Sequence, residues 1–178
     1  MSQNRTVHIL LTRSGTWFSH LIHFATQDRY THASIGLDGP CGTFYSFARK
    51  QEHFILPAGL VAEQITPSRR HIPCCLYELQ VSEETYFRLR HQIHSMYAQR
   101  EDYSYNLLGL LACYFNFPIR RQYHFFCSQF VARLLQDCGA AELPKSPDLL
   151  RPADLSDLKG LRPVHQGSLE GLLLNPAT

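Results

Sequence analysis

Hydrophobic and polar positions alternate with a period of two in several short segments of the chain, which is typical of strands with one buried face. The clearest case covers residues 75–81, and a short apolar run at residues 7–11 also has the character of a strand. The turn sequence Asp38-Gly39-Pro40 indicates a hairpin. Strands are therefore expected at residues 7–11, 30–37, 43–47, 75–81 and 164–169, with a brief one at 60–61.

Several segments repeat their apolar residues at the spacing of a helix. Ser82 is placed to cap one of them, and the two glutamates that follow it suit the positive end of the helix dipole. Helices are expected at residues 83–99, 106–115 and 127–138, with a shorter one at 19–25. The 106–115 helix is expected to be mostly buried and to end at Pro118, and Gly139 is placed to end the next one.

The length of 178 residues corresponds to one domain at roughly 150 residues per domain, so residues 1–178 are expected to form a single domain. Hydrophobic residues make up 44% of the chain and charged residues 18%, which excludes a disordered protein. The proline-rich tail after residue 143 is expected to wrap loosely around this domain before the last strand.

Charge and hydropathy exclude further classes of protein. The net charge of +2 provides no strong field for a polyanion, so nucleic acid is not expected as a partner. The longest apolar stretch, residues 107–117, is shorter than the roughly 20 residues of a membrane span, so no integral membrane segment is expected. The first six residues lack the apolar region of an export signal, and a cytoplasmic location is therefore expected.

The cysteines and histidines do not form a recognisable metal site. The six cysteines contain no C-x-x-C pair, so free thiols are expected rather than a zinc ribbon or a disulfide framework. His20 and His23, and likewise His91 and His94, have a spacing on expected helices that suits a metal, but no nearby acid or cysteine completes either pair. Neither a metal nor another cofactor is expected.

Cys127 is the strongest candidate for chemistry, because it lies in the first turn of an expected amphipathic helix. The unpaired backbone N–H groups and the positive end of the helix dipole lower the pKa of a thiol at that position. The same N–H groups can stabilise the oxyanion of a tetrahedral intermediate. A buried structural cysteine is the competing interpretation, and it is the commoner case for a lone cysteine.

A cysteine nucleophile usually works with a histidine base, and His32 is the best candidate for that base. It lies near the start of the expected strand 30–37, where the small residues Ser34 and Gly36 share its face and leave room beside the imidazole. A histidine bonded to a loop at the end of a strand is the competing interpretation. The presence of both Cys127 and His32 favours the catalytic one.

Two segments carry a resemblance to a known family: Tyr30-Thr31-His32-Ala33-Ser34-Ile35-Gly36 and Phe126-Cys127-Ser128-Gln129-Phe130-Val131. Together they resemble the circularly permuted branch of the NlpC-type papain-like superfamily of cysteine amidases and peptidases. Ordinary papain-like enzymes present the cysteine helix first, whereas here the histidine comes 95 positions before the cysteine, as in the permuted members. Residues 44–49 and 164–169 resemble an uncharacterised bacterial subset, which is distantly similar to lecithin:retinol acyltransferase-like proteins.

The resemblance implies an α+β fold in which an antiparallel sheet packs against helices and Cys127 begins a helix that faces His32. It also implies a third polar residue, on the strand after the histidine strand, that orients the imidazole. Ser46 occupies that strand, while Tyr45 points to its opposite face and is a candidate for substrate binding. Glu63 and Glu52 in the following excursion could take the orienting role in place of Ser46.

Two further substrate-binding residues are expected near the thiol. Members of this superfamily often place a tyrosine there, and Tyr105 is positioned to line the cleft or to donate a hydrogen bond to the oxyanion. Packing at the start of a helix is the competing role for Tyr105. Ser128, which follows the nucleophile, is the second expected contact of the substrate.

These observations favour a cysteine hydrolase that acts on a small peptide, amide or acyl substrate through the Cys127 thiolate and the His32 base. Ser46 is a weaker orienting group than a carboxylate, which favours instead a catalytically silent binding or scaffold domain with the same fold. A lipid thioesterase or acyltransferase and a metal-dependent protein are two more functions that the sequence leaves open.

Overall fold

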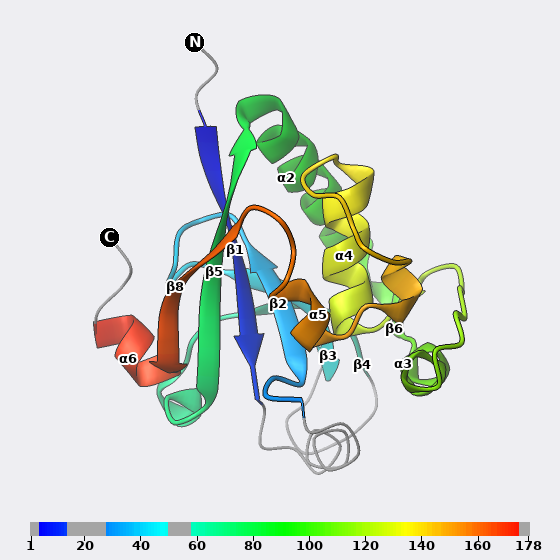
Figure 1. The fold of residues 1–178 in the computed structure, drawn as a ribbon, viewed down its shortest axis with the longest axis horizontal. Helices are drawn as coiled ribbons and strands as arrows, with labels where there is room; N and C mark the ends of the chain where they lie inside the picture. The colour runs from blue at the N-terminus through cyan, green and yellow to red at the C-terminus, as the bar shows by residue number, and fades with distance from the viewer. Residues whose placement is uncertain (1–3, 14–27, 50–57, 175–178) are drawn as a thin grey trace.

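The computed structural model describes residues 4–13, 28–49 and 58–174, and this part of the chain forms a mixed α+β structure. Within it, an antiparallel sheet of six strands in the order β4-β3-β2-β1-β5-β8 is the largest element (Figure 1). The strands of this sheet are β1 (Asn4–Thr12), β2 (His32–Gly36), β3 (Phe44–Arg49), β4 (Ala58–Glu63), β5 (Pro73–Ser82) and β8 (Leu161–Ser168). The short parallel strands β6 (Ser104–Tyr105) and β7 (His124–Phe125) pair with each other near β4.

Strand β1 lies in the middle of the sheet because its apolar run can be buried on both faces. Every residue from 7 to 12 is buried. On one side β1 pairs with β2, where Thr12 lies opposite His32, and on the other side it pairs with β5. This register fixes His32 at the end of β2 that lies beside the end of β1.

The helices lie on both faces of the sheet. Helices α2 and α4 cover one face, where they pack over the odd-numbered residues of β1, such as Ile9 and Leu11 (Figure 1). The short helix α6 packs beside β8 with Leu10 and Leu76 on the opposite face. The helices are α2 (Glu83–Ala98), α3 (Leu107–Tyr114), α4 (Cys127–Asp137), α5 (Pro152–Leu155) and α6 (Leu169–Leu174), and the 3₁₀ turns are η1 (Pro67–Arg69), η2 (Arg100–Asp102) and η3 (Pro147–Leu149).

Phe47, Phe125 and Phe130 form an aromatic cluster in which α4 and β7 pack against the sheet. Phe47 of β3 is fully buried, and its ring centroid lies 5.2 Å from that of Phe130 and 5.3 Å from that of Phe125. Tilted aromatic pairs at this separation are favourable beyond the area that they bury. The cluster therefore determines where the first turn of α4 lies relative to the sheet.

Replacement of Phe47 by alanine is expected to destabilise the protein by about 3–5 kcal/mol, because the site loses a buried ring and retains a cavity. The matched control is Phe117→Ala, since Phe117 is 64% exposed, and it should change the free energy of unfolding by less than about 0.5 kcal/mol. Urea unfolding of both variants measures the difference. Equal stability of the two variants would contradict the role of the cluster.

Most of the expected elements are confirmed, including the ends of two helices. The Ser82 hydroxyl accepts a hydrogen bond of 3.2 Å from the N–H of Thr85 and so caps α2. Gly139, with φ of +68°, follows α4 in the left-handed conformation that suits glycine at the end of a helix. The brief strand expected at residues 60–61 is longer, because it extends to β4 and pairs along its length with β3.

The prediction of a mostly buried helix at residues 106–115 is wrong. Helix α3 buries only Gly109, Leu110 and Cys113, while Leu108 is 55% exposed and Phe115 is 84% exposed. It packs on Phe126 through one narrow stripe, so the rest of its apolar surface is left without cover among the described residues. It also ends at Tyr114, before Pro118, because the chain turns through the C-cap at Phe115 and a positive φ at Asn116.

The tail is more regular than the loose wrap that was expected, because it contains η3, α5 and the unanticipated helix α6. The helix expected at residues 19–25 lies outside the described residues. Within the described part of the chain, no helix has the length and apolar character needed to cross a membrane.

Candidate active site

Cys127 is the first residue of α4, and the start of this helix is held by side-chain hydrogen bonds. The N–H of Phe126 donates to Oε1 of Gln129 at 3.1 Å, and Nε2 of Gln129 donates to Asp148 of η3 at 2.5 Å. Cys127, Gln129 and Phe126 are all buried. The nucleophile candidate is therefore fixed at a rigid helix terminus, where backbone N–H groups are free to act on it.

His32 lies within hydrogen-bonding range of the Cys127 thiol. The two residues meet because α4 packs on β2, whose first residue is His32. The backbone N–H groups of Ala33 and Ser128 also favour the thiolate and lower the pKa of Cys127. Cys127 is 2% exposed, and the His32 side chain beside it keeps 13% of its surface in contact with solvent.

Glu63, the last residue of β4, is bonded to His32 through a contact of 2.8 Å between Oε1 and Nε2. The hydroxyl of Ser46 donates to the same carboxylate oxygen, and Nη1 of Arg69 donates to Oε2 at 2.8 Å. Both oxygens of the carboxylate are thus engaged. Because Nε2 of His32 faces Glu63, Nδ1 is the ring nitrogen left for Cys127.

The charges in this chain of hydrogen bonds stabilise one another. Burial by itself lowers the pKa of His32, but the Glu63 carboxylate and the Cys127 thiol more than offset it and raise that pKa to about 10. Burial would raise the pKa of Glu63, yet His32, Arg69 and Ser46 hold it well below its ordinary value.

The pKa of Cys127 is shifted in the direction that favours the thiolate. Burial raises the pKa of its thiol, but the hydrogen bond and the charge of His32, together with the N–H groups of Ala33 and Ser128, lower it below the ordinary value of 9.0. The favoured state is therefore a thiolate beside an imidazolium that a carboxylate stabilises from its other side.

Tyr105 is also brought to the thiol, because β6 pairs with β7 immediately before α4. Its hydroxyl lies close enough to the side chain and backbone of Cys127 for both to affect the pKa of Tyr105. Burial and the adjacent Cys127 raise the pKa of Tyr105 well above its ordinary value, so the phenol keeps its proton. A neutral hydroxyl beside the backbone N–H of the nucleophile has the chemistry required to bind an oxyanion.

The expectation that Ser46 orients His32 is corrected by this geometry. Ser46 is fully buried and its hydroxyl points at Glu63, so it acts on the imidazole only through the carboxylate. Glu63 reaches His32 because its side chain is longer than that of serine. Glu52, the second glutamate considered for the orienting role, lies outside the described residues.

The expectation that Tyr45 lies on the face opposite Ser46 is confirmed, and the roles of Tyr45 and Ser128 in substrate binding stay predictions. The Tyr45 ring packs on α2, with its centroid 5.4 Å from that of Tyr97 and 6.2 Å from that of His94, so it faces away from Ser46 and Glu63. Ser128 is fully buried, and its hydroxyl has no hydrogen-bond partner among the described residues. Only the backbone N–H of Ser128 takes part in the site.

Arg69 was not anticipated, and Glu63 was only one of several candidates for the orienting residue. The sequence placed Glu63 only in the excursion after the Ser46 strand, whereas the structure places it at the end of β4, which pairs with that strand. Arg69 follows six positions later and folds back through η1.

Among the described residues, no group of three or more histidine, cysteine, aspartate or glutamate side chains is arranged to hold a metal ion. His20 and His23 lie outside the described residues.

Comparisons with models of protein families, with curated proteins and with solved structures find no match to this chain.

Proposed function

We propose that the protein is a cysteine hydrolase of the permuted papain-like type, which cleaves an amide or ester bond. The observation that carries this proposal is the chain of hydrogen bonds from Arg69 and Ser46 through Glu63 to His32, with the Cys127 thiol beside the imidazole. Strongly shifted pKa values that arise from specific charged partners are typical of functional sites. A nucleophile, a base and an orienting group in this order form a catalytic triad.

In the first half of the reaction, the Cys127 thiolate attacks the carbonyl carbon of the substrate and a carbon–sulfur bond forms. The negative charge that develops on the carbonyl oxygen is stabilised by the backbone N–H of Cys127 and the hydroxyl of Tyr105. When the tetrahedral intermediate collapses, the His32 imidazolium gives its proton to the leaving amine or alcohol. The product of this half is an acyl-enzyme and a neutral imidazole.

In the second half, His32 takes a proton from water, and the resulting hydroxide attacks the acyl carbon. Collapse of this second intermediate releases the acid and regenerates the thiolate and the imidazolium. If an alcohol or amine takes the place of water, the same steps transfer the acyl group, so an acyltransferase uses identical residues. A cytoplasmic amide, isopeptide or acyl ester is the substrate class that belongs to this proposal.

Glu63 has two roles in this scheme. Its bond to Nε2 holds the imidazole in the orientation that leaves Nδ1 facing the sulfur. Its negative charge stabilises the imidazolium throughout the first half of the reaction. A scaffold domain gives no reason for placing a thiol, an imidazole, a carboxylate and a guanidinium in one nearly buried chain, since each charge there must be compensated.

Alkylation with iodoacetamide tests the proposal without knowledge of the substrate. At about pH 6 an ordinary thiol is almost wholly protonated, so a thiolate stabilised by His32 should be alkylated first. We expect Cys127 to react far faster than Cys74, Cys113 and Cys138, whose pKa values burial raises. Peptide mapping by mass spectrometry identifies the modified residue, with the exposed Cys41 as the reference thiol.

The same experiment on His32→Ala separates catalytic activation from simple accessibility. Loss of the imidazolium should return Cys127 to slow alkylation at about pH 6, while the rate at Cys41 stays unchanged. Equal alkylation of Cys127 in the two proteins, or slow reaction of all the buried thiols in both, would support the scaffold domain instead.

A further inference from the structure

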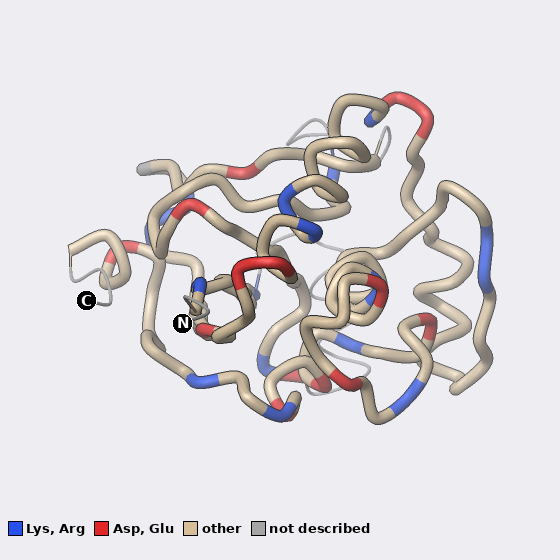
Figure 2. Tube along the Cα trace, turned by 90° about the horizontal axis from the view of Figure 1, so that it is seen from above, with Lys and Arg blue, Asp and Glu red and all other residues tan. Residues whose placement is uncertain are grey.

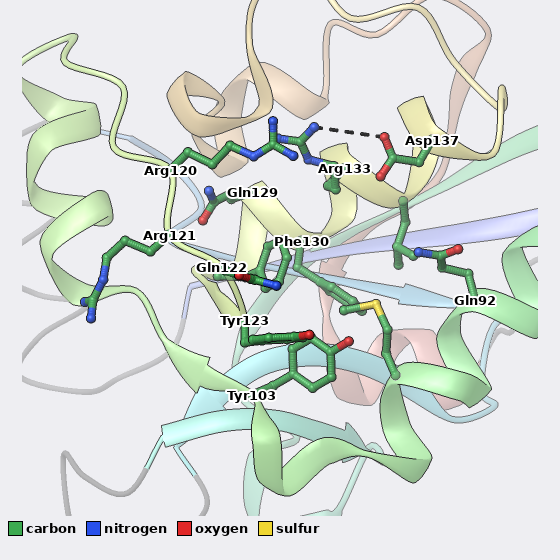
Figure 3. A pocket seen from close by; sticks show the side chains of 13 residues that line it. Gln92, Tyr103, Arg120, Arg121, Gln122, Tyr123, Gln129, Phe130, Arg133 and Asp137 are labelled. Carbon is green, nitrogen blue, oxygen red and sulfur yellow. Dashed lines mark ion pairs between the residues drawn. The ribbon is translucent and has the colours of Figure 1, made fainter.

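A cleft of about 460 Å³ lies between α2, α4 and the segment of residues 120–125 that leads into α4 (Figure 3). This volume is within the range of pockets that hold small molecules. The described residues that line it include neither Cys127 nor His32 nor Glu63. The cleft is therefore distinct from the candidate active site, although Phe125 and Gln129 border it on either side of the nucleophile in sequence.

One part of the cleft is aromatic. Tyr103 and Tyr123 meet edge to face with ring centroids 5.5 Å apart (Figure 3). The ring centroid of Phe125 lies 6.2 Å from that of Tyr103. Tyr123 is 47% exposed and has a φ of +58°, an unfavourable conformation for a bulky residue. Backbone strain of this kind is concentrated at functional sites, where it places a side chain in a required position.

The opposite part of the cleft is cationic. Arg120, Arg121 and Arg133 line it, and Asp137 is the single acid among its described lining residues. In Figure 3 the side chains of Arg120 and Arg133 point toward one another, whereas Arg121 extends away. Arg133 has only long ion pairs, 4.0 Å to Asp137 and 3.9 Å to Asp148, and Arg120 has no ion pair within the described part of the chain.

Asp137 and Asp148 partly offset the charge of Arg133, whereas the sequence around Arg120 and Arg121 provides little negative charge. Basic and acidic residues are interspersed over most of the chain (Figure 2). In contrast, residues 103–136 contain no aspartate or glutamate, although all three arginines of the cleft fall within this stretch. Two guanidinium groups directed at each other repel, and a bound anion relieves that repulsion.

We propose that this cleft binds a small organic anion that carries a phosphate or carboxylate group on an aromatic or apolar body. The anionic group lies between Arg120 and Arg133, because guanidinium groups bind phosphate and carboxylate oxygens in pairs. The body of the ligand packs on Tyr103 and Tyr123. Gln92 and Gln122, which also line the cleft, supply neutral hydrogen-bond donors and acceptors beside it.

Calorimetric titration with four probes tests both halves of the site. Phenyl phosphate and benzoate each carry an anion and a ring, inorganic phosphate carries only the anion, and phenol only the ring. We expect saturable binding of one of the two aryl anions at a single site, at least about ten-fold tighter than inorganic phosphate or phenol. The tighter of phenyl phosphate and benzoate identifies the anionic group of the natural ligand.

Three variants localise the binding. Arg120→Gln should weaken the binding of the tighter-binding aryl anion by about ten-fold or more, because the substitution removes a charged hydrogen-bond donor. Arg90→Gln, an exposed arginine on α2 outside the cleft, is the matched control and should leave the affinity unchanged. Cys127→Ala should also bind normally, so failure of the proposed hydrolase leaves this result intact.

Two results would overturn the proposal. One is the lack of saturable binding of either aryl anion up to about 10 mM, which is weaker than a small ligand with both contacts should bind. The second is equal weakening by Arg120→Gln and Arg90→Gln, because that pattern reflects only the general positive charge of the surface.

Discussion

If the proposed function holds, we expect Cys127→Ala to abolish the hydrolysis of a p-nitrophenyl ester and to leave the fold unchanged. The expected loss in kcat is about 10⁴-fold or more, because the variant has no nucleophile and retains only the oxyanion donors and the binding surface. The substitution removes one sulfur atom and leaves only a small cavity beside Cβ, so the fold should be retained. Release of p-nitrophenol measures activity, and far-ultraviolet circular dichroism with urea unfolding measures the fold.

Cys138→Ala is the matched control for this substitution. Cys138 is another buried thiol, at the C-terminal end of the same helix, and burial raises its pKa. Its replacement should leave the rate of ester hydrolysis within a factor of about two. Retained hydrolysis by Cys127→Ala, with or without a loss in Cys138→Ala, would eliminate Cys127 as the nucleophile.

Glu63→Gln has the second largest expected effect, and it acts on the pH dependence as well as on the rate. The Glu63 carboxylate and the Cys127 thiol together raise the pKa of His32 to about 10 against the effect of burial, so the neutral amide, which removes the charge of Glu63, should lower that pKa. His32 must be protonated to donate to the leaving group, and activity is therefore lost as pH rises through its pKa. The alkaline limb of kcat/KM should move from near pH 10 toward neutrality.

The acid limb of kcat/KM should move to higher pH in Glu63→Gln. The Cys127 thiolate is lost as pH falls through its lowered pKa, and the imidazolium that stabilises it is weakened in the variant. The pH range of activity therefore narrows from both sides, and the rate at neutral pH falls by about 10²-fold or more. Because the thiol and the imidazole titrate together, the two limbs report the pair rather than either residue alone.

Glu78→Gln is the control for Glu63→Gln. Glu78 also lies beside a buried histidine, His8, with 3.7 Å between Oε1 and Nε2, but this pair is on β5 and β1. Its replacement should leave both limbs of the pH profile in place. An alkaline limb that stays unchanged in Glu63→Gln would show that the carboxylate does not set the protonation of His32.

Much of the site could be foreseen because its main features are local. The position of Cys127 at a helix start follows from the apolar spacing of residues 127–138, and His32 at a strand start follows from the small residues after it. Both patterns depend only on the side-chain periodicity of helices and strands. That the two residues meet was an inference from resemblance, and the packing of α4 on β2 brings them together.

The orienting residue could not be chosen in the same way. Ser46 and Glu63 lie on neighbouring strands, and which of them reaches His32 depends on the pairing of β3 with β4 and on side-chain length. The sequence pattern showed only two residues of β4, which placed Glu63 in a loop. Arg69 depends on a further return of the chain through η1.

By itself, the sequence determined the longer strands and helices, the free thiols and the two segments that hold Cys127 and His32, because short-range periodicity and capping encode each of them. The tertiary structure decided which carboxylate joins the pair, that α3 leaves its apolar face exposed, and that three arginines and two tyrosines share one cleft. Those features join residues that are far apart along the chain, and the contacts depend on strand register and helix packing. Neither strand register nor helix packing is encoded by a local sequence pattern.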